Sequence, residues 1–367
     1  VKLGRFQGGC TSPLCDLAGG LPSLPVLSGS ASSPRAPSAW KAGPMRIVTV
    51  TAPGGIENLT LAEAETPTPA SGEVLIAVTA AGVNRADLLQ RQGFYPPPPG
   101  ISEVIGLEVS GVIAEVGAGV TGWTPGDPCV ALLAGGGYAD YVAVPAGQVI
   151  PVPTGVDLVS AAGLIEVSAT VVSNFDHVHL SAGETVLIHG GAGGIGTFAI
   201  QYAKALGARV IVTAGSPEKL QLCRELGADV GLDYHQDWPA ALSEATNGAG
   251  VDVILDVMGA KYLEANVAAL AADGRLVVIG LQGGRKATLD LNRLLTKRAT
   301  VTATSLRGRP VEQKAEICAR VAEVVWPMIT NGEIRMAPET RFAMTQVADA
   351  HAHLESGANT GKILLVW

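Results

Sequence analysis

A cluster of glycines between an apolar segment and a helical pattern is the part of this sequence that indicates chemistry most directly. We name it the glycine loop, and it comprises Gly190, Gly191, Gly193, Gly194, Ile195 and Gly196. Its spacing fits the G-x-G-x-x-G fingerprint, which gains specificity when a strand precedes it and a helix follows. Glycines let backbone N–H groups approach a pyrophosphate, and a helix N-terminus favours the negative charge. We therefore expect a bound dinucleotide here; a glycine-rich turn without a ligand is the alternative.

The residues after the next predicted strand indicate which dinucleotide binds. NAD enzymes usually place Asp or Glu about 20 residues beyond such a loop, on the ribose 2′-hydroxyl. This chain has no carboxylate there and continues Val212-Thr-Ala-Gly-Ser216. Ser216, at a helix N-terminus, and the cation Lys219 are placed to bind a 2′-phosphate. We therefore expect NADPH; alternatively, Ser216 only caps the helix and Lys219 is solvated.

Strand and helix patterns alternate around the glycine loop, and these elements must position it. The predicted strands cover residues 185–189, 209–213, 230–233, 251–256, 275–280 and 300–304. A helix is predicted over 217–226, with Ser216 as its N-cap and Pro217 in its first turn. This order predicts an α/β fold with a Rossmann-type, doubly wound parallel sheet of six strands. We expect the nicotinamide ring beside Gly280 and Leu281, because ligands bind outside the carboxyl ends of such strands.

The part of the chain before this sheet has a different pattern. From Met45 to about Pro153, short apolar or alternating runs are separated by Gly/Pro turns, which predicts a compact, mostly β domain. Strand and turn signals return over 335–367, and we expect this tail to pack on the β domain. Residues 1–44 are rich in Gly, Pro, Ser and Ala without periodicity, so they are interpreted as a disordered extension.

Composition excludes several classes of function. The net charge of −8 and the lack of a basic block argue against nucleic acid as a partner. No apolar run reaches the length of a membrane span. The five cysteines form no disulfide framework, which favours the cytoplasm, and Cys129, Cys223 and Cys318 are interpreted as core residues.

Several segments together carry a resemblance to a known family. They cover residues 84–100, 106–117, 131–138 and 190–196. Through them, residues 45–367 resemble the zeta-crystallin-like quinone oxidoreductases, a zinc-free branch of the medium-chain dehydrogenase/reductase superfamily. The 84–100 segment points to the tumour-suppressor-inducible quinone oxidoreductase subgroup. The resemblance implies a GroES-like catalytic domain over 45–168 and 306–367, and a Rossmann NADPH-binding domain over 169–305.

The resemblance also implies a reaction and the residues that support it. Its members transfer hydride from nicotinamide C4 to a quinone or activated alkene without a metal. Asn84 and Tyr95 then line the substrate cleft, although Asn84 is alternatively a satisfied buried amide and Tyr95 only packs on the proline run that follows it. The cofactor-binding residues implied in addition to the glycine loop are Thr170, Tyr234 and Asn359.

Zinc is not expected in this chain. Zinc-dependent relatives carry a cysteine near Asn84 and a histidine at the position of Leu107, and neither residue present here is a zinc ligand. The chain also departs from the family motif at Ser168, where the relatives have an aromatic residue, while Glu166 and Thr170 are kept. This departure puts the size and preference of the substrate in doubt.

The leading function is therefore an NADPH:quinone oxidoreductase. An NADPH-dependent enone or enoyl reductase is the alternative among enzymes, and a non-catalytic NADPH-binding protein is the alternative outside them. We also expect a homodimer, because the strand predicted over 300–304 is rich in β-branched residues and lies at a sheet edge that a second subunit can cover.

Overall fold

The structure, a computed structural model, describes residues 43–367 of the chain. The expectation of a disordered extension over residues 1–44 therefore lies almost wholly outside the described residues. The first strand, β1 (Pro44–Val50), begins one residue before Met45 and forms an antiparallel ribbon with β2 (Leu59–Glu65).

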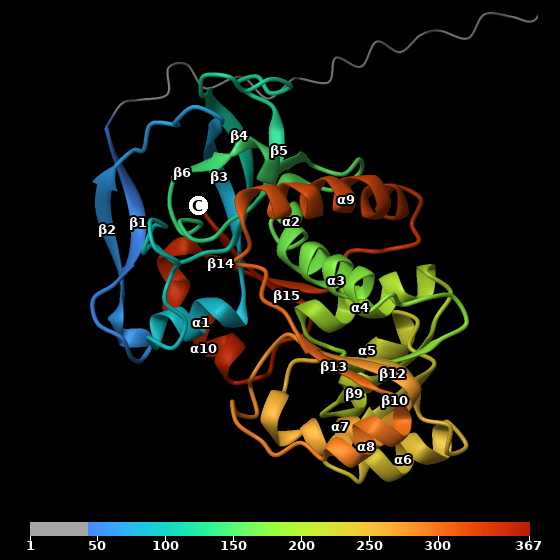
Figure 1. Ribbon diagram of the computed structural model, residues 1–367. Coiled ribbons are helices and arrows are strands. Elements are labelled where there is room, and N and C mark those ends of the chain that lie inside the picture. The colour runs from blue at the N-terminus through green and yellow to red at the C-terminus, as the bar shows by residue number, and fades with distance from the viewer. Residues whose placement is uncertain (1–42) are drawn as a thin grey trace, which may run out of the picture. The chain divides into compact units, whose positions relative to one another are not determined.

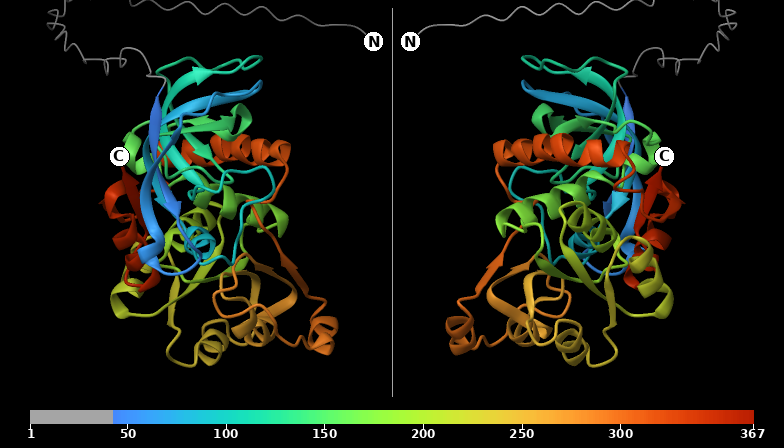
Figure 2. Two further views of the ribbon diagram at one scale, coloured as in Figure 1. Left: turned by 90° about the vertical axis from the view of Figure 1, so that its left-hand side faces the viewer. Right: turned by 90° about the vertical axis from the view of Figure 1, so that its right-hand side faces the viewer.

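A mixed, largely antiparallel sheet of seven strands is formed by both ends of the described chain. Its strands are β3 (Glu73–Val83), β4 (Glu108–Val116), β5 (Pro128–Leu132), β6 (Tyr141–Pro145), β7 (Val149–Pro151), β14 (Glu339–Ala343) and β15 (Lys362–Val366). Strand β15 pairs antiparallel with β3, Ile363 lying opposite Val83. In both views of Figure 2, the C-terminal segment lies beside the ribbon of β1 and β2. Residues near the C-terminus thus complete a sheet that begins with residues of the first half.

A parallel sheet of six strands follows in the second half, in the order β10-β9-β8-β11-β12-β13. These strands are β8 (Thr185–His189), β9 (Arg209–Ala214), β10 (Val230–Asp233), β11 (Val251–Asp256), β12 (Leu270–Val278) and β13 (Thr300–Ala303). The order is that of a doubly wound dinucleotide-binding fold. The predicted fold class, a Rossmann sheet combined with a GroES-like β domain, is confirmed. The boundaries proposed at 168/169 and 305/306 stay a prediction.

The strand predicted over residues 275–280 has different bounds in the structure, where it is β12. It begins at Leu270 instead of residue 275, because a register shift between Val251 and Val253 lets Leu270 pair with Val251. It also ends at Val278, so Gly280 and Leu281 lie beyond the strand rather than at its end.

Helices connect the strands and cover the sheets (Figure 1). Their bounds are α1 (Arg85–Arg91), α2 (Leu158–Ala161), α3 (Ile165–His177), α4 (Gly194–Ala205), α5 (Pro217–Glu225), α6 (Trp238–Ala245), α7 (Leu263–Ala269), α8 (Leu291–Lys297), α9 (Val311–Thr330) and α10 (Val347–Glu355). Helix α5 begins where the sequence predicts, since the Ser216 hydroxyl accepts a hydrogen bond from the Lys219 N–H at 3.3 Å. Only strand and turn signals were expected over 335–367, and that expectation is wrong for α10, whose buried face of Val347, Ala350 and His351 has helical spacing.

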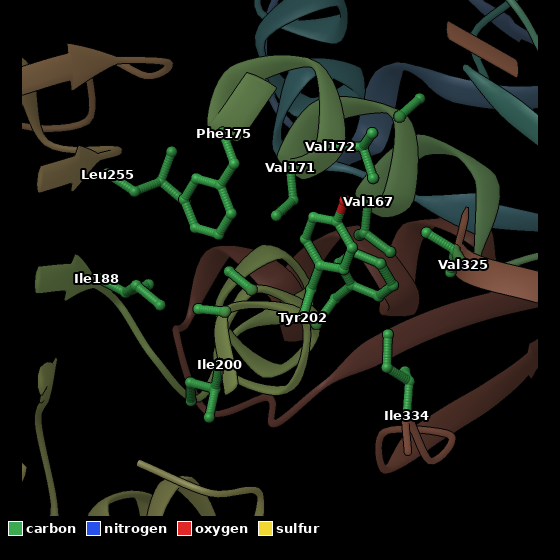
Figure 3. Packing of buried hydrophobic residues seen from close by; sticks show 14 of the residues in the cluster. Val167, Val171, Val172, Phe175, Ile188, Ile200, Tyr202, Leu255, Val325 and Ile334 are labelled. Carbon is green, nitrogen blue, oxygen red and sulfur yellow. The ribbon is translucent and has the colours of Figure 1, made fainter. Parts of the chain in front are cut away.

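The largest core cluster packs α3 against α4, the helix that begins in the glycine loop. Figure 3 shows Val167, Val171 and Phe175 of α3 packed with Tyr202 of α4 and with strand residues of the parallel sheet. The rings of Phe175 and Tyr202 are stacked, with centroids 6.2 Å apart. Because full burial of each large apolar side chain contributes about 1.5–3 kcal/mol, α3 is firmly held along its length.

Single polar and sulfur-containing residues are also part of the cores. His189 lies between the rings of Trp238 and Tyr262, and burial lowers its pKa to about 4. Cys129, Cys223 and Cys318 are buried, as expected for core residues.

Within the described residues, no helix combines the length and apolar character needed to cross a membrane.

Candidate active site

The glycine loop has the tight geometry that a phosphate cradle requires. Gly190 has φ +73°, which disfavours other residues there, and a Cβ at Gly196 would run into the backbone of Gly190 and Gly191. Gly193 is the N-cap of α4, so the N–H groups of the first turn have no partner within the helix. These donors and the helix dipole suit an anionic ligand, so the loop fits a pyrophosphate.

The segment before β15 lies beside the glycine loop. The Gly361 N–H donates to the Ala192 carbonyl at 2.8 Å, and Gly361 forms a parallel bridge with Gly193. This contact brings the half-buried Asn359 to the neighbourhood of the loop, where a cofactor-binding role was predicted for it. Its side-chain amide makes a long hydrogen bond of 3.5 Å to the Gly361 carbonyl.

The structure gathers the three residues predicted to bind a 2′-phosphate. Ser216 caps α5 through the Lys219 N–H, and the ring of Tyr234 lies so close to Gly215 that a Cβ there would collide with it. The Tyr234 side chain is largely accessible, at 42% exposure. The Lys219 ammonium donates to the Gly357 carbonyl at 2.5 Å. Lys219 is therefore tied to the segment after α10 and is not a freely solvated lysine.

The residues predicted beside the nicotinamide lie at the carboxyl end of the parallel sheet. Gly280 lies against the backbone of Val257, whose carbonyl oxygen would be 2.8 Å from an added Cβ. The side chain of Leu281 is 52% exposed. Thr170 is half-buried on α3, and its carbonyl accepts a hydrogen bond from the Asn174 amide at 2.7 Å. Their roles toward the cofactor stay predictions.

Asn84 lies in a dense polar network rather than free in a cleft. Its amide nitrogen donates to Glu108 Oε1 at 2.9 Å, and its Oδ1 accepts from the Lys362 ammonium at 2.8 Å. Its backbone N–H donates to Asp87 at 2.7 Å, which fixes the start of α1. Both ends of the side chain are thus occupied, mainly by other side chains and only weakly by the Gly82 carbonyl at 3.4 Å.

A buried ion pair supports this network. Lys362 Nζ lies 2.5 Å from Glu108 Oε1, and Glu108 has no exposed surface. The second oxygen of Glu108 accepts from the Glu166 backbone N–H at 2.9 Å. Neither Glu108 nor Lys362 was predicted from the sequence as a functional residue. Each is the charged first residue of a largely apolar strand. This pattern could have indicated an ion pair, because Lys and Glu are almost never fully buried unless paired.

Tyr95 is held by the segment that follows β13. Its hydroxyl lies 3.1 Å from the Ser305 hydroxyl, and its carbonyl accepts from Arg307 at 3.1 Å. The Arg307 guanidinium also lies 5.1 Å from the centre of the Tyr95 ring. The partners of Tyr95 are thus Ser305 and Arg307, and not only the proline run that was the alternative contact expected from the sequence.

A second buried network joins Asp87 of α1 to Tyr138 and His351, and it was not predicted from the sequence. The Tyr138 hydroxyl donates to Asp87 at 3.1 Å and lies 3.3 Å from His351 Nε2. Burial raises the pKa of Asp87 to about 7 and lowers that of His351 to about 3. For both groups, the low-dielectric interior thus shifts the equilibrium toward the neutral form.

Metal ligands are not gathered in the part of the chain that the structure describes. Within residues 43–367, no group of three or more His, Cys, Asp and Glu side chains is arranged to hold a metal ion.

Comparisons with known proteins agree with this architecture. Residues 70–154 match the alcohol dehydrogenase GroES-like domain, and residues 194–322 match the zinc-binding dehydrogenase family. A quinone oxidoreductase of Pseudomonas aeruginosa is 32% identical over 85% of this chain and 97% of its own length. A polyketide synthase subunit of Mycobacterium tuberculosis is 31% identical over 85% of this chain, which spans 14% of that protein.

Two solved structures are similar throughout. A mycobacterial protein complexed with NADPH has a TM-score of 0.80 and 33% identity, covering 88% of this chain and 100% of that one. Escherichia coli quinone oxidoreductase complexed with NADPH has a TM-score of 0.79 and 29% identity, covering 88% and 99%. The chain belongs to the medium-chain dehydrogenase/reductase superfamily, in its quinone oxidoreductase branch. The narrower subgroup expected from residues 84–100 stays a prediction.

Proposed function

We propose that this chain is an NADPH-dependent quinone oxidoreductase. The observation that carries the proposal is the cofactor cradle: a glycine loop at the start of α4, with Ser216, Lys219 and Tyr234 beyond the next strand, whose end over residues 212–216 contains no carboxylate. Two structural neighbours bind NADPH, which supports the same cofactor here. The bound cofactor supplies a hydride from nicotinamide C4.

The chain's own residues bind and orient the two reactants. The N–H groups at the start of α4 hold the pyrophosphate, and Ser216, Lys219 and Tyr234 hold the 2′-phosphate. Thr170, Gly280, Leu281 and Asn359 border the remaining cofactor. Asn84 and Tyr95 line the acceptor cleft. Orientation of this kind can supply about 7–11 kcal/mol of a barrier, and the hydride chemistry itself belongs to the cofactor.

A second candidate is an NADPH-dependent enone or enoyl reductase. The match to polyketide synthases supports it, although the chain spans 14% of that relative. Both reactions use the same cofactor cradle and differ in the acceptor that the cleft takes. A non-catalytic NADPH-binding protein is the third candidate, and the family's oxidoreductases argue against it.

Turnover assays separate these candidates. NADPH oxidation is followed by absorbance with a panel of small quinones and a panel of enones. We expect faster turnover with quinones; faster turnover with enones establishes the second candidate. Tight NADPH binding without turnover of either panel establishes the third.

Cofactor preference is tested at Lys219. We expect NADPH to bind about ten- to a thousandfold tighter than NADH, because each charge-assisted bond to the 2′-phosphate contributes about 1.5–3 kcal/mol. Lys219→Ala should weaken NADPH at least about tenfold and leave NADH unchanged, as measured by fluorescence titration. Lys204→Ala is the matched control, since this lysine pairs with Asp229 at 3.0 Å outside the cradle. Equal affinities for the two cofactors in the native protein would exclude the proposed phosphate site.

We further propose a cytoplasmic homodimer that acts on small molecules. The dimer is supported by β13, which lies at the edge of the parallel sheet. The cytoplasm is supported by the scattered cysteines of the sequence.

A further inference from the structure

Glu166 is a carboxyl group at the candidate site to which no role has been given above. It lies in the first turn of α3, and its backbone N–H donates to Glu108. Its side chain is half-buried, and no hydrogen bond to its carboxyl oxygens is found among residues 43–367. Lys362 and Arg307 nearby have hydrogen-bond partners in the protein. Because the Glu166 carboxyl has none among the described residues, it is available to interact with a ligand.

Glu166 shares a face of α3 with Thr170, the residue predicted beside the nicotinamide carboxamide. Glu166 and Thr170 are four residues apart on α3, so their side chains lie on one face, one turn from each other. Both are half-buried while their neighbours Val167, Ser168 and Ala169 are buried. The face of α3 that carries Glu166 and Thr170 is therefore less completely buried than the residues between them.

Charged groups from several elements surround Glu166. The pKa of Glu166 responds to the charges of four groups from different elements: Glu108 of β4, Asp87 of α1, Lys362 of β15 and Arg307 of the segment before α9. Lys314 and Cys318 of α9 also interact with it electrostatically. Lys362 binds Asn84, and Arg307 binds Tyr95. Glu166 therefore lies near both groups, Lys362 and Arg307, that hold the two residues predicted to line the acceptor cleft.

These surroundings favour a protonated carboxyl. Burial is the main cause, and the negative charge of Glu108 adds to it, with Lys362 opposing; together they raise the pKa of Glu166 to about 8. The charge of Asp87 acts in the same direction as that of Glu108, whereas Arg307 opposes it as Lys362 does, so burial decides the direction of the shift. At neutral pH, Glu166 thus holds a proton that it can give to a base.

We propose that Glu166 is the proton donor to the acceptor reduced at this site, an inference that rests on the proposed function. The hydride brings two electrons and one proton to the acceptor and leaves the cofactor oxidised. The oxyanion that forms on a quinone or enone takes the proton from the Glu166 carboxyl, whose O–H bond breaks. The product is the neutral hydroquinone from a quinone, or from an enone the enol, which tautomerises to the saturated ketone in water; the Glu166 carboxylate regains a proton from water.

The test compares Glu166→Gln with the native protein between pH 6 and 9.5, with a quinone and with an enone. We expect native kcat to fall as pH rises through about 8, since the protonated form is the active one. In Glu166→Gln, kcat should fall about a hundredfold at pH 7 and lose this pH dependence, because an amide donates no proton. NADPH affinity, measured by fluorescence, should stay within about threefold, since general acid catalysis acts on kcat and not on cofactor binding. Glu312→Gln, an exposed residue in the first turn of α9, is the matched control and should behave as the native protein does.

The outcomes distinguish this inference from the proposed function. Native turnover combined with an unchanged kcat in Glu166→Gln overturns the role of Glu166 and leaves the oxidoreductase intact. A native kcat that is flat through pH 9 overturns it as well, and this measurement needs no variant to fold. Glu166→Asp should keep the pH dependence at reduced kcat. NADPH binding without turnover by the native protein overturns the proposed function and this inference with it.

Discussion

At the scale of single residues, the ion pair between Lys362 and Glu108 determines how firmly the candidate site is held. Both side chains are buried, and each also bonds Asn84, so one pair joins β4, α1 and β15. Charges removed from water are expensive, and their attraction offsets that cost only while both partners are present. The pair therefore makes the site sensitive to the loss of either member.

Lys362→Met tests this sensitivity. The substitution leaves Glu108 buried with its counter-charge removed, and we expect it to lower the free energy of unfolding by about 3–5 kcal/mol. Urea-induced unfolding measures the loss. The double variant Glu108→Gln/Lys362→Met should recover part of it, because the orphaned charge is then absent. A single variant as stable as the native protein would show that the pair contributes nothing.

The sequence predicts the residues of a cofactor cradle and of an acceptor cleft, and these roles stay predictions, but it did not indicate the partners that the structure shows for Asn84 and Tyr95. The glycine loop is local, since its glycines are neighbours in the chain and their spacing carries the signal. The partners of Asn84 are Glu108 and Lys362, the latter 278 residues away, and no local pattern joins them. The contacts of Tyr95 with Ser305 and Arg307 likewise depend on the tertiary fold.

At the scale of elements, the segment between α10 and β15 connects two parts of the predicted cofactor site. The Gly357 carbonyl accepts from Lys219, and Gly361 pairs with the glycine loop. Gly361 has φ +62°, and a Cβ there would run into the Pro338 carbonyl oxygen. The position of this segment beside the glycine loop thus requires glycine at residue 361.

Gly361→Ala and Gly357→Ala form a matched pair of variants. Both glycines have positive φ, but a Cβ at Gly357 has no atom within 4 Å. We expect Gly357→Ala to cost about 1 kcal/mol of stability and Gly361→Ala clearly more, because only the latter adds a backbone clash. Gly361→Ala should also weaken NADPH binding, since it displaces the segment from the glycine loop. Thermal unfolding and NADPH titration measure both effects; equal losses in the two variants would contradict the role of the clash.

Elements with strong periodicity were predictable, and irregular ones were not. The βα alternation gave the strands of the parallel sheet because each is an apolar run bounded by turn residues. Helix α10 was missed since its buried face includes a histidine, which a search for apolar residues passes over. The early start of β12 depends on a bulge against β11, which is a property of the pairing and not of either segment.

At the scale of the whole molecule, the edge of the parallel sheet is the feature that favours association. Among the described residues, β13 pairs only with β12, so its other side presents unpaired backbone groups. Helix α8, which directly precedes β13, carries Leu291 and Leu295 at 69% and 77% exposure. These leucines are four residues apart and lie on one face of the helix. An unpaired edge strand next to exposed leucines is the surface that a second copy of the chain can cover.

Leu295→Glu tests whether this surface forms the dimer. We expect the native protein to have twice the chain mass of 37.4 kDa in solution, and the variant to have the mass of one chain, because a charge at the centre of an apolar contact loses its hydration. Light scattering coupled to gel filtration measures both masses. Leu61→Glu is the matched control, since Leu61 on β2 is 45% exposed and lies outside the parallel sheet. A native protein with the mass of one chain would exclude the dimer, and a variant that stays dimeric would move the interface away from α8.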